Sequence, residues 1–427
     1  MLLTAKKSKL SGSVRIPGSK SHTIRAIAIA SLAKGKSIIK APLISNDALS
    51  AVACYRGLGA KIDTSDDKKW LIEGIGTDIT PVISTIDIGN SGTALRLAAG
   101  SSALASPETT VTLTGDHQIQ ARPIQPLLDA LNDLGASARS LKNNGCAPIE
   151  VSGTLKGGTT TIECITSQYL SSLLMACPLA SGDSTINVTL LNEPDYVRIT
   201  MDWLDMQGIQ YTNNNWKQFV IPGGQSYQPF DRAIPADFSS ATFFLCAGAL
   251  LGGEILIRGL DFSDSQPDKA VADYLKSMGA DISDTDEGIL VKKSDLKGIE
   301  IDMNRTPDAL PAMAVTAALA EGTTRLVNVP QARKKETDRI ACMASELSKI
   351  GANVEELPDG LVIHGQGGKN LKAAAVTGHH DHRIVMAMAI AGMALEGNTQ
   401  IDTAEAMDVT FPEYVKLMTA IGANLNI

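Results

Sequence analysis

The chain has 427 residues, 44% of them hydrophobic, 20% charged and only 4% aromatic, with a net charge of −8. This composition is typical of a soluble globular protein, and the length exceeds one ordinary hydrophobic core, so we expect at least two domains. No basic block and no apolar run of membrane-spanning length occurs, which argues against nucleic-acid-binding and membrane proteins. The first residues do not resemble a signal peptide, and the six cysteines lack C-x-x-C spacing, so we expect a cytoplasmic protein with reduced thiols.

The first distinctive stretch is IPGSKSHTIRAIAIASLA at residues 16–33, where basic and hydroxyl residues precede an apolar run. It is not a nucleotide P-loop, because Ser19 stands between the glycine and Lys20. A helix N-terminus nevertheless offers unpaired N–H groups and a positive dipole to an anion, and Lys20 and Arg25 add full charges. By itself, the stretch fits equally well a helix capped by Ser21 with a solvated Lys20.

Helices of the same apolar, Ala-rich kind recur along the chain, each followed by a turn and a β-branched strand. Apolar residues on all sides of a helix predict burial on all sides. The six stretches lie at residues 19–39, 91–104, 171–188, 239–257, 308–327 and 381–401.

A second series of amphipathic helices alternates with the first, and each of these ends at a glycine that leads into a strand. A glycine there is typical of a left-handed helix C-cap. The glycines recur at intervals of 71 to 76 residues, at Gly59, Gly135, Gly208, Gly279, Gly351 and Gly422. The chain therefore looks like six copies of one α/β unit. A solenoid is the alternative, although solenoid helices are usually amphipathic.

Polar residues cluster where the apolar helices begin. If the repeats pack symmetrically, these ends converge and predict a binding site for an anionic ligand. The residues are Lys20, Ser21, Arg25, Asn90, Gly92, Thr93, Thr166, Ser167, Gln168, Asp237, Ser239, Ser240, Asp308, Asp381, His382 and Arg383.

Seven motifs in order resemble the 5-enolpyruvylshikimate-3-phosphate synthase family, one of the enolpyruvyl transferases. They are PGSKSHTIR, GNSGTALR, ARPI, TSQYLSSLLM, PDALPAMA, KKETDR and DHR. The resemblance covers nearly the whole chain. It implies an α/β fold of two similar domains, each of three βαβαββ units with buried parallel helices (an inside-out α/β barrel), in agreement with the six-fold repeat.

The same resemblance implies a discontinuous first domain, residues 1–19 plus 237–427, a second domain, residues 20–236, and an active-site cleft between them. We expect hinges near residues 17–20 and 235–238. We also expect a first strand over residues 2–16 that joins the C-terminal half.

The implied reaction transfers the enolpyruvyl group of phosphoenolpyruvate to the 5-hydroxyl of shikimate 3-phosphate and releases phosphate. It needs one proton delivered to carbon and one removed from oxygen, but no metal and no other cofactor. The resemblance places the enzyme in the shikimate pathway of chorismate and aromatic amino acid biosynthesis. It further implies a cytoplasmic monomer that is a glyphosate target and binds neither nucleic acid nor membranes.

The resemblance also implies roles for individual residues. Asp308 would accept the 5-hydroxyl proton, while Glu336 and Lys20 would manage the proton at carbon. Shikimate 3-phosphate would be bound by Lys20, Ser21, Arg25, Thr166, Ser167, Gln168, Asp308, Gln331 and Lys335. Phosphoenolpyruvate would be bound by Lys20, Asn90, Gly92, Arg122, Gln168, Arg339 and Arg383, since arginine forks suit carboxylate and phosphate.

Each of these features also has a plainer interpretation. KKETDR could be a solvated helix start, and Asp308 only an N-cap. His379, His380, Asp381 and His382 could bind a metal, although no second group of ligands stands elsewhere.

Three positions depart from the family pattern. The family commonly has Asn at the place of Gln331 and Lys at the place of Val409, and it has Ser-x-Pro-Tyr where this chain has Glu-Pro-Asp-Tyr from Glu193. A carboxylate beside a bound phosphate would be repelled, which leaves two interpretations. Either Glu193 points outward and Pro194 reshapes the loop, which we expect because Thr166, Ser167 and Lys335 still resemble a phosphate-binding set, or the acceptor lacks a phosphate at this place.

Two other functions remain as alternatives. The first is the sister transferase acting on UDP-N-acetylglucosamine, which has Lys-Asn in place of Lys20-Ser21 and a reactive cysteine in a loop. No cysteine occurs in the corresponding loop at residues 114–123. The second is a non-catalytic anion-binding protein, which would not need both Asp308 and Glu336.

Overall fold

The computed structural model describes residues 1–427, and the chain forms two compact units. The first unit consists of Met1–Pro17 and Pro235–Ile427, and the second of Gly18–Ile234. Gly18 and Ser19 thus belong to the second unit, where the Ser19 carbonyl accepts from Thr23 N in the first turn of a helix. None of the helices is both long and apolar enough to cross a membrane.

Each unit contains three four-stranded sheets, and all six sheets share one strand pattern. An outer strand runs parallel to its neighbour, which pairs antiparallel with a third strand, and the third strand pairs antiparallel with a fourth. Each sheet with its two helices forms one βαβαββ repeat, so the predicted six-fold α/β repeat is confirmed and the solenoid alternative is wrong.

The second unit consists of three such repeats. The first repeat comprises β14 (Asp231–Ala233), α1 (Lys20–Leu32), β3 (Lys34–Lys40), α2 (Asn46–Gly57), β4 (Lys61–Asp66) and β5 (Lys69–Ile75). The second comprises β6 (Thr85–Asp87), α3 (Gly92–Ser102), β7 (Thr110–Thr114), α4 (Gln125–Asp133), β8 (Ser137–Ser140) and β9 (Ile149–Ser152). The third comprises β10 (Gly158–Cys164), α5 (Ser167–Ala176), β11 (Ser184–Leu191), α6 (Pro194–Met206), β12 (Thr212–Asn214) and β13 (Gln218–Ile221).

The first unit repeats the same pattern. Its first repeat comprises β2 (Gly12–Arg15), α7 (Phe238–Leu251), β15 (Glu254–Arg258), α8 (Ala270–Ser277), β16 (Asp281–Thr285) and β17 (Gly288–Lys292). The next comprises β18 (Glu300–Asp302), α9 (Leu310–Leu319), β19 (Glu321–Val327), α10 (Arg339–Lys349), β20 (Asn353–Leu357) and β21 (Gly360–Gln366). The last comprises β22 (Ala375–Val376), α11 (His382–Ala394), β23 (Asn398–Ile401), α12 (Tyr414–Ala420), β24 (Asn424–Asn426) and β1 (Leu3–Lys6).

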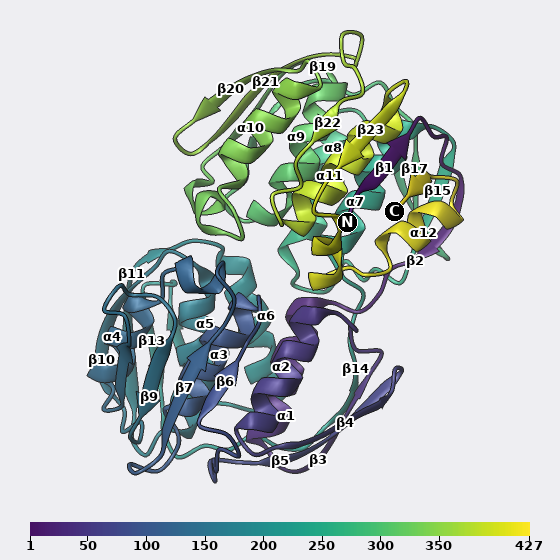
Figure 1. Cartoon of the computed structure of the whole chain (residues 1–427). Coiled ribbons are helices and arrows are strands. Elements are labelled where there is room, and N and C mark those ends of the chain that lie inside the picture. The colour runs from purple at the N-terminus through teal and green to yellow at the C-terminus, as the bar shows by residue number, and fades with distance from the viewer. The chain divides into compact units, whose positions relative to one another are not determined.

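The N-terminal segment completes two sheets of the C-terminal half, as Figure 1 shows by the purple strand β1 among yellow elements. Leu3 of β1 lies opposite Ile401 of β23, and Val14 of β2 lies opposite Ile257 of β15. The expectation of one continuous strand over residues 2–16 is wrong, because β1 and β2 belong to two different sheets.

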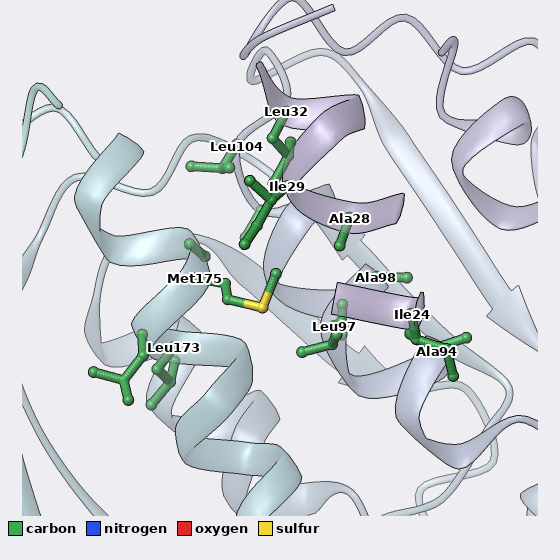
Figure 2. Packing of buried hydrophobic residues seen from close by; sticks show 14 of the residues in the cluster. Ile24, Ala28, Ile29, Leu32, Ala94, Leu97, Ala98, Leu104, Leu173 and Met175 are labelled. Atoms are coloured by element: carbon green, nitrogen blue, oxygen red, sulfur yellow. The ribbon is translucent and has the colours of Figure 1, made fainter. Parts of the chain in front are cut away.

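Three apolar helices form the interior of each unit, α1, α3 and α5 in the second and α7, α9 and α11 in the first, and the helices of each set contact one another. In α7, 13 of 14 residues are buried. Figure 2 shows side chains of α1, α3 and α5 gathered in one core, among them Ile29, Leu97 and Met175. Helices inside and sheets outside give the predicted inside-out α/β fold.

The amphipathic helices α2, α4, α6, α8, α10 and α12 end at the six predicted glycines. All six glycines have positive φ, from 71° at Gly208 to 114° at Gly59, so the left-handed C-caps are confirmed. Glycine adopts this conformation without the Cβ penalty of other residues, which explains its recurrence at one place in each repeat.

Candidate functional site

The buried helices of the second unit begin at the residues that the sequence singled out. Lys20 is the first residue of α1, Gly92 of α3 and Ser167 of α5. The Gln168 Nε2 atom donates to Thr93 Oγ1 over 3.2 Å, which joins the N-termini of α3 and α5. Backbone N–H groups at the beginnings of α3 and α5 therefore open toward one region of this unit.

Lys20 is held by a carboxylate that sequence reasoning did not select. Its ammonium lies 3.1 Å from Asp47 Oδ2, and both side chains are largely buried. Asp47 lies in the first turn of α2, after the N-cap Ser45, whose hydroxyl accepts from Ala48 N. An acidic residue in a helix's first turn is common for capping reasons alone, so the sequence carried no signal for its contact with Lys20.

Arg122 and Asn90 are neighbours in the same unit. Arg122 Nη2 donates to Asn90 Oδ1 over 3.2 Å. The Asn90 amide in turn donates to Asp116 Oδ2 over 2.6 Å and to Gln118 Oε1. Arg122 is 8% exposed. The structure therefore brings together two of the residues predicted to bind phosphoenolpyruvate.

Arg96 belongs to the motif GNSGTALR but was not among the predicted site residues. Its guanidinium donates to the Gly92 carbonyl over 3.1 Å and to the Pro123 carbonyl over 2.9 Å. A methyl group added to Gly92 would lie 2.8 Å from Arg96 Nη1 and 2.9 Å from Arg122 Nη1. Arg96 and Arg122 thus both approach the backbone at Gly92. The only indication of Arg96 in the sequence was its place as the last residue of the motif GNSGTALR.

Arg25 is buried and directs its donors into its own unit. Nε donates to Thr200 Oγ1 over 2.8 Å, Nη1 to the Ser21 carbonyl over 3.0 Å and Nη2 to the Tyr196 carbonyl over 3.0 Å. Burial lowers the pKa of Arg25 to about 10. Arg25 therefore positions the N-terminal end of α1 against α6, and its binding to shikimate 3-phosphate stays a prediction.

Glu193 does not point outward, and the expectation that it would is wrong. Its side chain is buried, with 1% exposed. Its Oε2 atom accepts from Ser167 Oγ over 2.8 Å, from Ser167 N over 3.3 Å and from Thr166 Oγ1 over 3.5 Å. The physical reason is that the N-terminus of α5 supplies a positive dipole and donors without partners in the helix, which attract an intramolecular carboxylate as they would any anion.

In the first unit, Arg339 is surrounded by carboxylates. Nε donates to Asp381 Oδ2 over 2.8 Å and Nη1 to Asp308 Oδ1 over 2.8 Å, while Nη2 donates to Glu336 Oε2. Only 1% of its side chain is exposed. Burial opposes its charge, but these carboxylates raise the pKa of Arg339 well above the ordinary arginine value.

Arg383 and Lys335 lie on the other sides of Asp308. Arg383 Nη2 is 2.9 Å from Asp308 Oδ2 and donates to Ser239 Oγ over 2.8 Å, and Lys335 Nζ is 3.8 Å from Asp308 Oδ1. The predicted catalytic residues Asp308 and Glu336 therefore lie together with three predicted anion-binding cations. We call Asp308, Lys335, Glu336, Arg339, Asp381 and Arg383 the Arg339 cluster.

Gln331 and Val409, two of the positions that depart from the family pattern, lie in short 3-10 helices of the first unit. The Gln331 amide is buried and donates to the Asn304 carbonyl over 2.9 Å. Val409 ends the helix Ala404–Val409 and is half-buried. The role of Gln331 in substrate binding stays a prediction.

The three histidines near the cluster have separate partners. His379 Nε2 lies 2.8 Å from Glu346 Oε1, His380 N donates to Thr403 Oγ1, and His382 Nδ1 is 3.8 Å from Asp381 Oδ1. No group of three or more His, Cys, Asp or Glu residues is arranged to hold a metal ion. All six cysteines are free, and burial raises the pKa of Cys54, Cys164, Cys177 and Cys246 to about 12.

His382 makes the stability of the first unit dependent on pH. Burial lowers its pKa from 6.5 to about 3, against the attraction of Asp381 and Glu336. Between these values the unfolded chain binds a proton that the folded chain does not, so the free energy of unfolding rises with pH across this window. At pH 5 the resulting loss is about 2 kcal/mol relative to neutral pH.

We therefore expect His382→Gln to reduce the difference in free energy of unfolding between pH 7 and pH 5 by about 2 kcal/mol. Urea denaturation followed by far-ultraviolet circular dichroism at both pH values measures it. His364→Gln, at an exposed position of the same unit, is the matched control. An unchanged pH difference in the His382 variant would show that folding does not lower the pKa of this imidazole.

Comparisons with known proteins agree in one family. Residues 4–418 match the family model described as EPSP synthase (3-phosphoshikimate 1-carboxyvinyltransferase). The chain is 51% identical over its full length to the 3-phosphoshikimate 1-carboxyvinyltransferase of Ruminiclostridium cellulolyticum, and 52% identical to that of Acetivibrio thermocellus over 100% of the chain and 99% of the relative. Its fold is similar to that of a solved EPSP synthase from Acinetobacter baumannii, with a TM-score of 0.83, 26% identity and coverage of 100% and 99% of the two chains.

Proposed function

The chain belongs to the EPSP synthase family, and on this basis we propose how its residues divide the reaction between them. The enzyme is a transferase of the shikimate pathway, and it moves the enolpyruvyl group of phosphoenolpyruvate to the 5-hydroxyl of shikimate 3-phosphate, releasing phosphate. The sister activity on UDP-N-acetylglucosamine is not favoured, because relatives at 41% to 52% identity carry the shikimate name.

Asp308 lies between Arg339 and Arg383, and this observation is the main support for the proposed catalytic roles. Each oxygen of this carboxylate has an arginine within 2.9 Å. The phosphate and carboxylate of phosphoenolpyruvate compete for the same guanidinium donors. When the substrate draws Arg383 toward itself, Asp308 gains an available lone pair with which to accept the 5-hydroxyl proton.

Glu336 and Lys20 complete the proton transfers in this proposal. Glu336 is 13% exposed and contacts Arg339, so it is placed to exchange a proton with a group at the edge of the Arg339 cluster. Lys20 begins α1 and is paired with Asp47, and its ammonium can donate as well as neutralise phosphate charge. The addition of the hydroxyl and the elimination of phosphate then each use one acid and one base from this set.

Arg339 has little capacity left for substrate. Four of its five N–H bonds are accounted for by contacts with Asp381, Asp308 and Glu336. We therefore propose that Arg339 mainly keeps the three carboxylates ionised and oriented. Arg122 and Arg383 would supply the direct forks to phosphoenolpyruvate.

We also propose that the enzyme works in the cytoplasm as a monomer and is inhibited by glyphosate. This part of the proposal is supported by the family resemblance alone. Size-exclusion chromatography with light scattering tests whether the enzyme is a monomer. Glyphosate inhibition measured at several phosphoenolpyruvate concentrations tests whether it is a glyphosate target.

Gly92→Ala is expected to raise the Michaelis constant for phosphoenolpyruvate by about tenfold or more. The added methyl would lie 2.8 Å from Arg96 Nη1 and 2.9 Å from Arg122 Nη1, closer than real Cβ contacts, so the two guanidinium groups must shift. Steady-state kinetics with each substrate varied in turn measures the effect. The Michaelis constant for shikimate 3-phosphate should change less than threefold, and an equal rise for both substrates would contradict this placement of Arg122.

A further inference from the structure

The carboxylate of Glu193 occupies the donor set at the beginning of α5. Ser167 is the first residue of that helix, so its N–H has no partner within the helix, and it donates to Glu193 together with the Ser167 and Thr166 hydroxyls. One backbone N–H and two hydroxyls at a helix N-terminus form a typical phosphate-binding set. In this structure an acidic side chain of the same unit fills it.

The backbone at Glu193 shows that this placement is maintained at a cost. Glu193 has φ 58° and ψ 48°, a left-handed conformation that residues other than glycine rarely adopt. It precedes Pro194, the first residue of α6, and its carbonyl accepts from Tyr196 N over 3.1 Å. Asn192 N is fixed on the other side by the Cys164 carbonyl over 3.1 Å. Hydrogen bonds thus hold the backbone on both sides of Glu193.

Two anions cannot share these donors. Unit negative charges about 4 Å apart repel by roughly 4 kcal/mol at an effective dielectric near 20, and a phosphate dianion roughly doubles this value. A phosphate that binds at Thr166 and Ser167 must therefore displace the carboxylate of Glu193, at least to a position beyond direct contact.

We propose that Glu193 is a specificity-determining residue that competes, as an intramolecular anion, with the phosphate of the acceptor substrate. The proposal rests on the proposed function and on the family resemblance, which implies that Thr166 and Ser167 hold the phosphate of shikimate 3-phosphate. Binding of the phosphorylated acceptor is then an exchange of one anion for another. The exchange lowers the affinity for the acceptor and rejects ligands whose anionic group is too weak to displace the carboxylate.

The first consequence concerns Glu193→Ser, which empties the donor set. We expect the Michaelis constant and the dissociation constant for shikimate 3-phosphate to fall by about tenfold or more. The turnover number and the Michaelis constant for phosphoenolpyruvate should change less than threefold. Glu193→Gln keeps the size of the side chain but removes its charge, so an intermediate gain of about threefold to tenfold is expected.

Two controls separate competition from a general change in charge or stability. Glu163→Ser removes a carboxylate from an exposed position of β10 in the same unit and should leave both constants unchanged. Trp203 lies in α6, the helix that Glu193 precedes, so its fluorescence reports whether this helix remains folded in the Glu193 variants. Binding of unphosphorylated shikimate should gain less than threefold in Glu193→Ser, because that ligand has no phosphate to place in the donor set.

The closing experiment is isothermal titration calorimetry of the wild type, Glu193→Ser, Glu193→Gln and Glu163→Ser. Each protein is titrated with inorganic phosphate, shikimate 3-phosphate and unphosphorylated shikimate. Tighter binding of both phosphate ligands in Glu193→Ser supports the proposal. Affinities within threefold of the wild type in folded Glu193 variants would overturn it, as would an equal gain for unphosphorylated shikimate. Titration with inorganic phosphate does not require turnover, so a wild type that fails to turn over shikimate 3-phosphate would count against the proposed function separately.

Discussion

Replacing Arg339 by methionine is expected to lower the free energy of unfolding by about 3–5 kcal/mol, the cost typical of removing one partner from a buried ion pair. Arg339 is the only cation in contact with both oxygens of Asp381 among the ion pairs of the first unit, and Asp381 is fully buried. Burial opposes the charge of Asp381, while Arg339 holds its pKa below the ordinary value. Without Arg339, a buried carboxylate is left with only weaker hydrogen bonds.

The three tryptophans allow this loss to be assigned to one unit. Trp70, Trp203 and Trp216 all lie within Gly18–Ile234, so tryptophan fluorescence reports the second unit alone, whereas circular dichroism reports both. In the Arg339→Met variant, urea should reduce the circular dichroism signal well before the fluorescence changes. Arg325→Met is the matched control, because the pair of Arg325 with Glu300 is about half-exposed and should contribute no more than about 1 kcal/mol. Coincident transitions at the wild-type midpoint would contradict the structural role given to Arg339.

The second large effect is expected for Asp308→Ala, which should lower the turnover number by about 10²- to 10⁴-fold. General base catalysis acts in the chemical step, so the loss should appear in turnover and in kcat/KM together. The Michaelis constant for phosphoenolpyruvate should stay the same or fall, because removal of Asp308 releases the guanidinium groups of Arg339 and Arg383 for substrate. Steady-state kinetics with both substrates measures these parameters.

Asp308→Asn and Asp286→Ala are the controls for this experiment. Asn keeps the shape of the side chain but is a poor base, so it should lose nearly as much turnover as Ala. Asp286 is exposed in the turn between β16 and β17 and should have no effect. If Asp308→Ala raised only the Michaelis constants, Asp308 would be a positioning residue.

The fold could be predicted from the sequence because its determinants are local and repeated. A helix such as α7 is apolar on every side, and a glycine such as Gly208 marks the end of an amphipathic helix. The expectation of one strand over residues 2–16 was wrong because its determinants are not local. Which sheet a short strand joins depends on partners such as Ile401 and Ile257, hundreds of residues away.

The candidate site could be predicted only in part. Position at a helix N-terminus singled out Lys20, Ser167 and Asp381 from the residues alone, and the family resemblance supplied the roles proposed for Lys20 and Ser167. Contacts between elements were not predictable in this way. Asp47 beside Lys20 has an ordinary capping position in sequence. The inward orientation of Glu193 depends on how the loop before α6 meets the beginning of α5.

The decisive measurement for the proposed reaction is release of phosphate from phosphoenolpyruvate, followed together with the enolpyruvyl product and with each substrate omitted in turn. We expect one phosphate to be released for each enolpyruvyl group transferred to shikimate 3-phosphate. We expect no release when either substrate is absent, and a loss of about 10²-fold or more in Asp308→Ala. Release of phosphate without the acceptor, or transfer to UDP-N-acetylglucosamine in place of shikimate 3-phosphate, would contradict the proposed reaction.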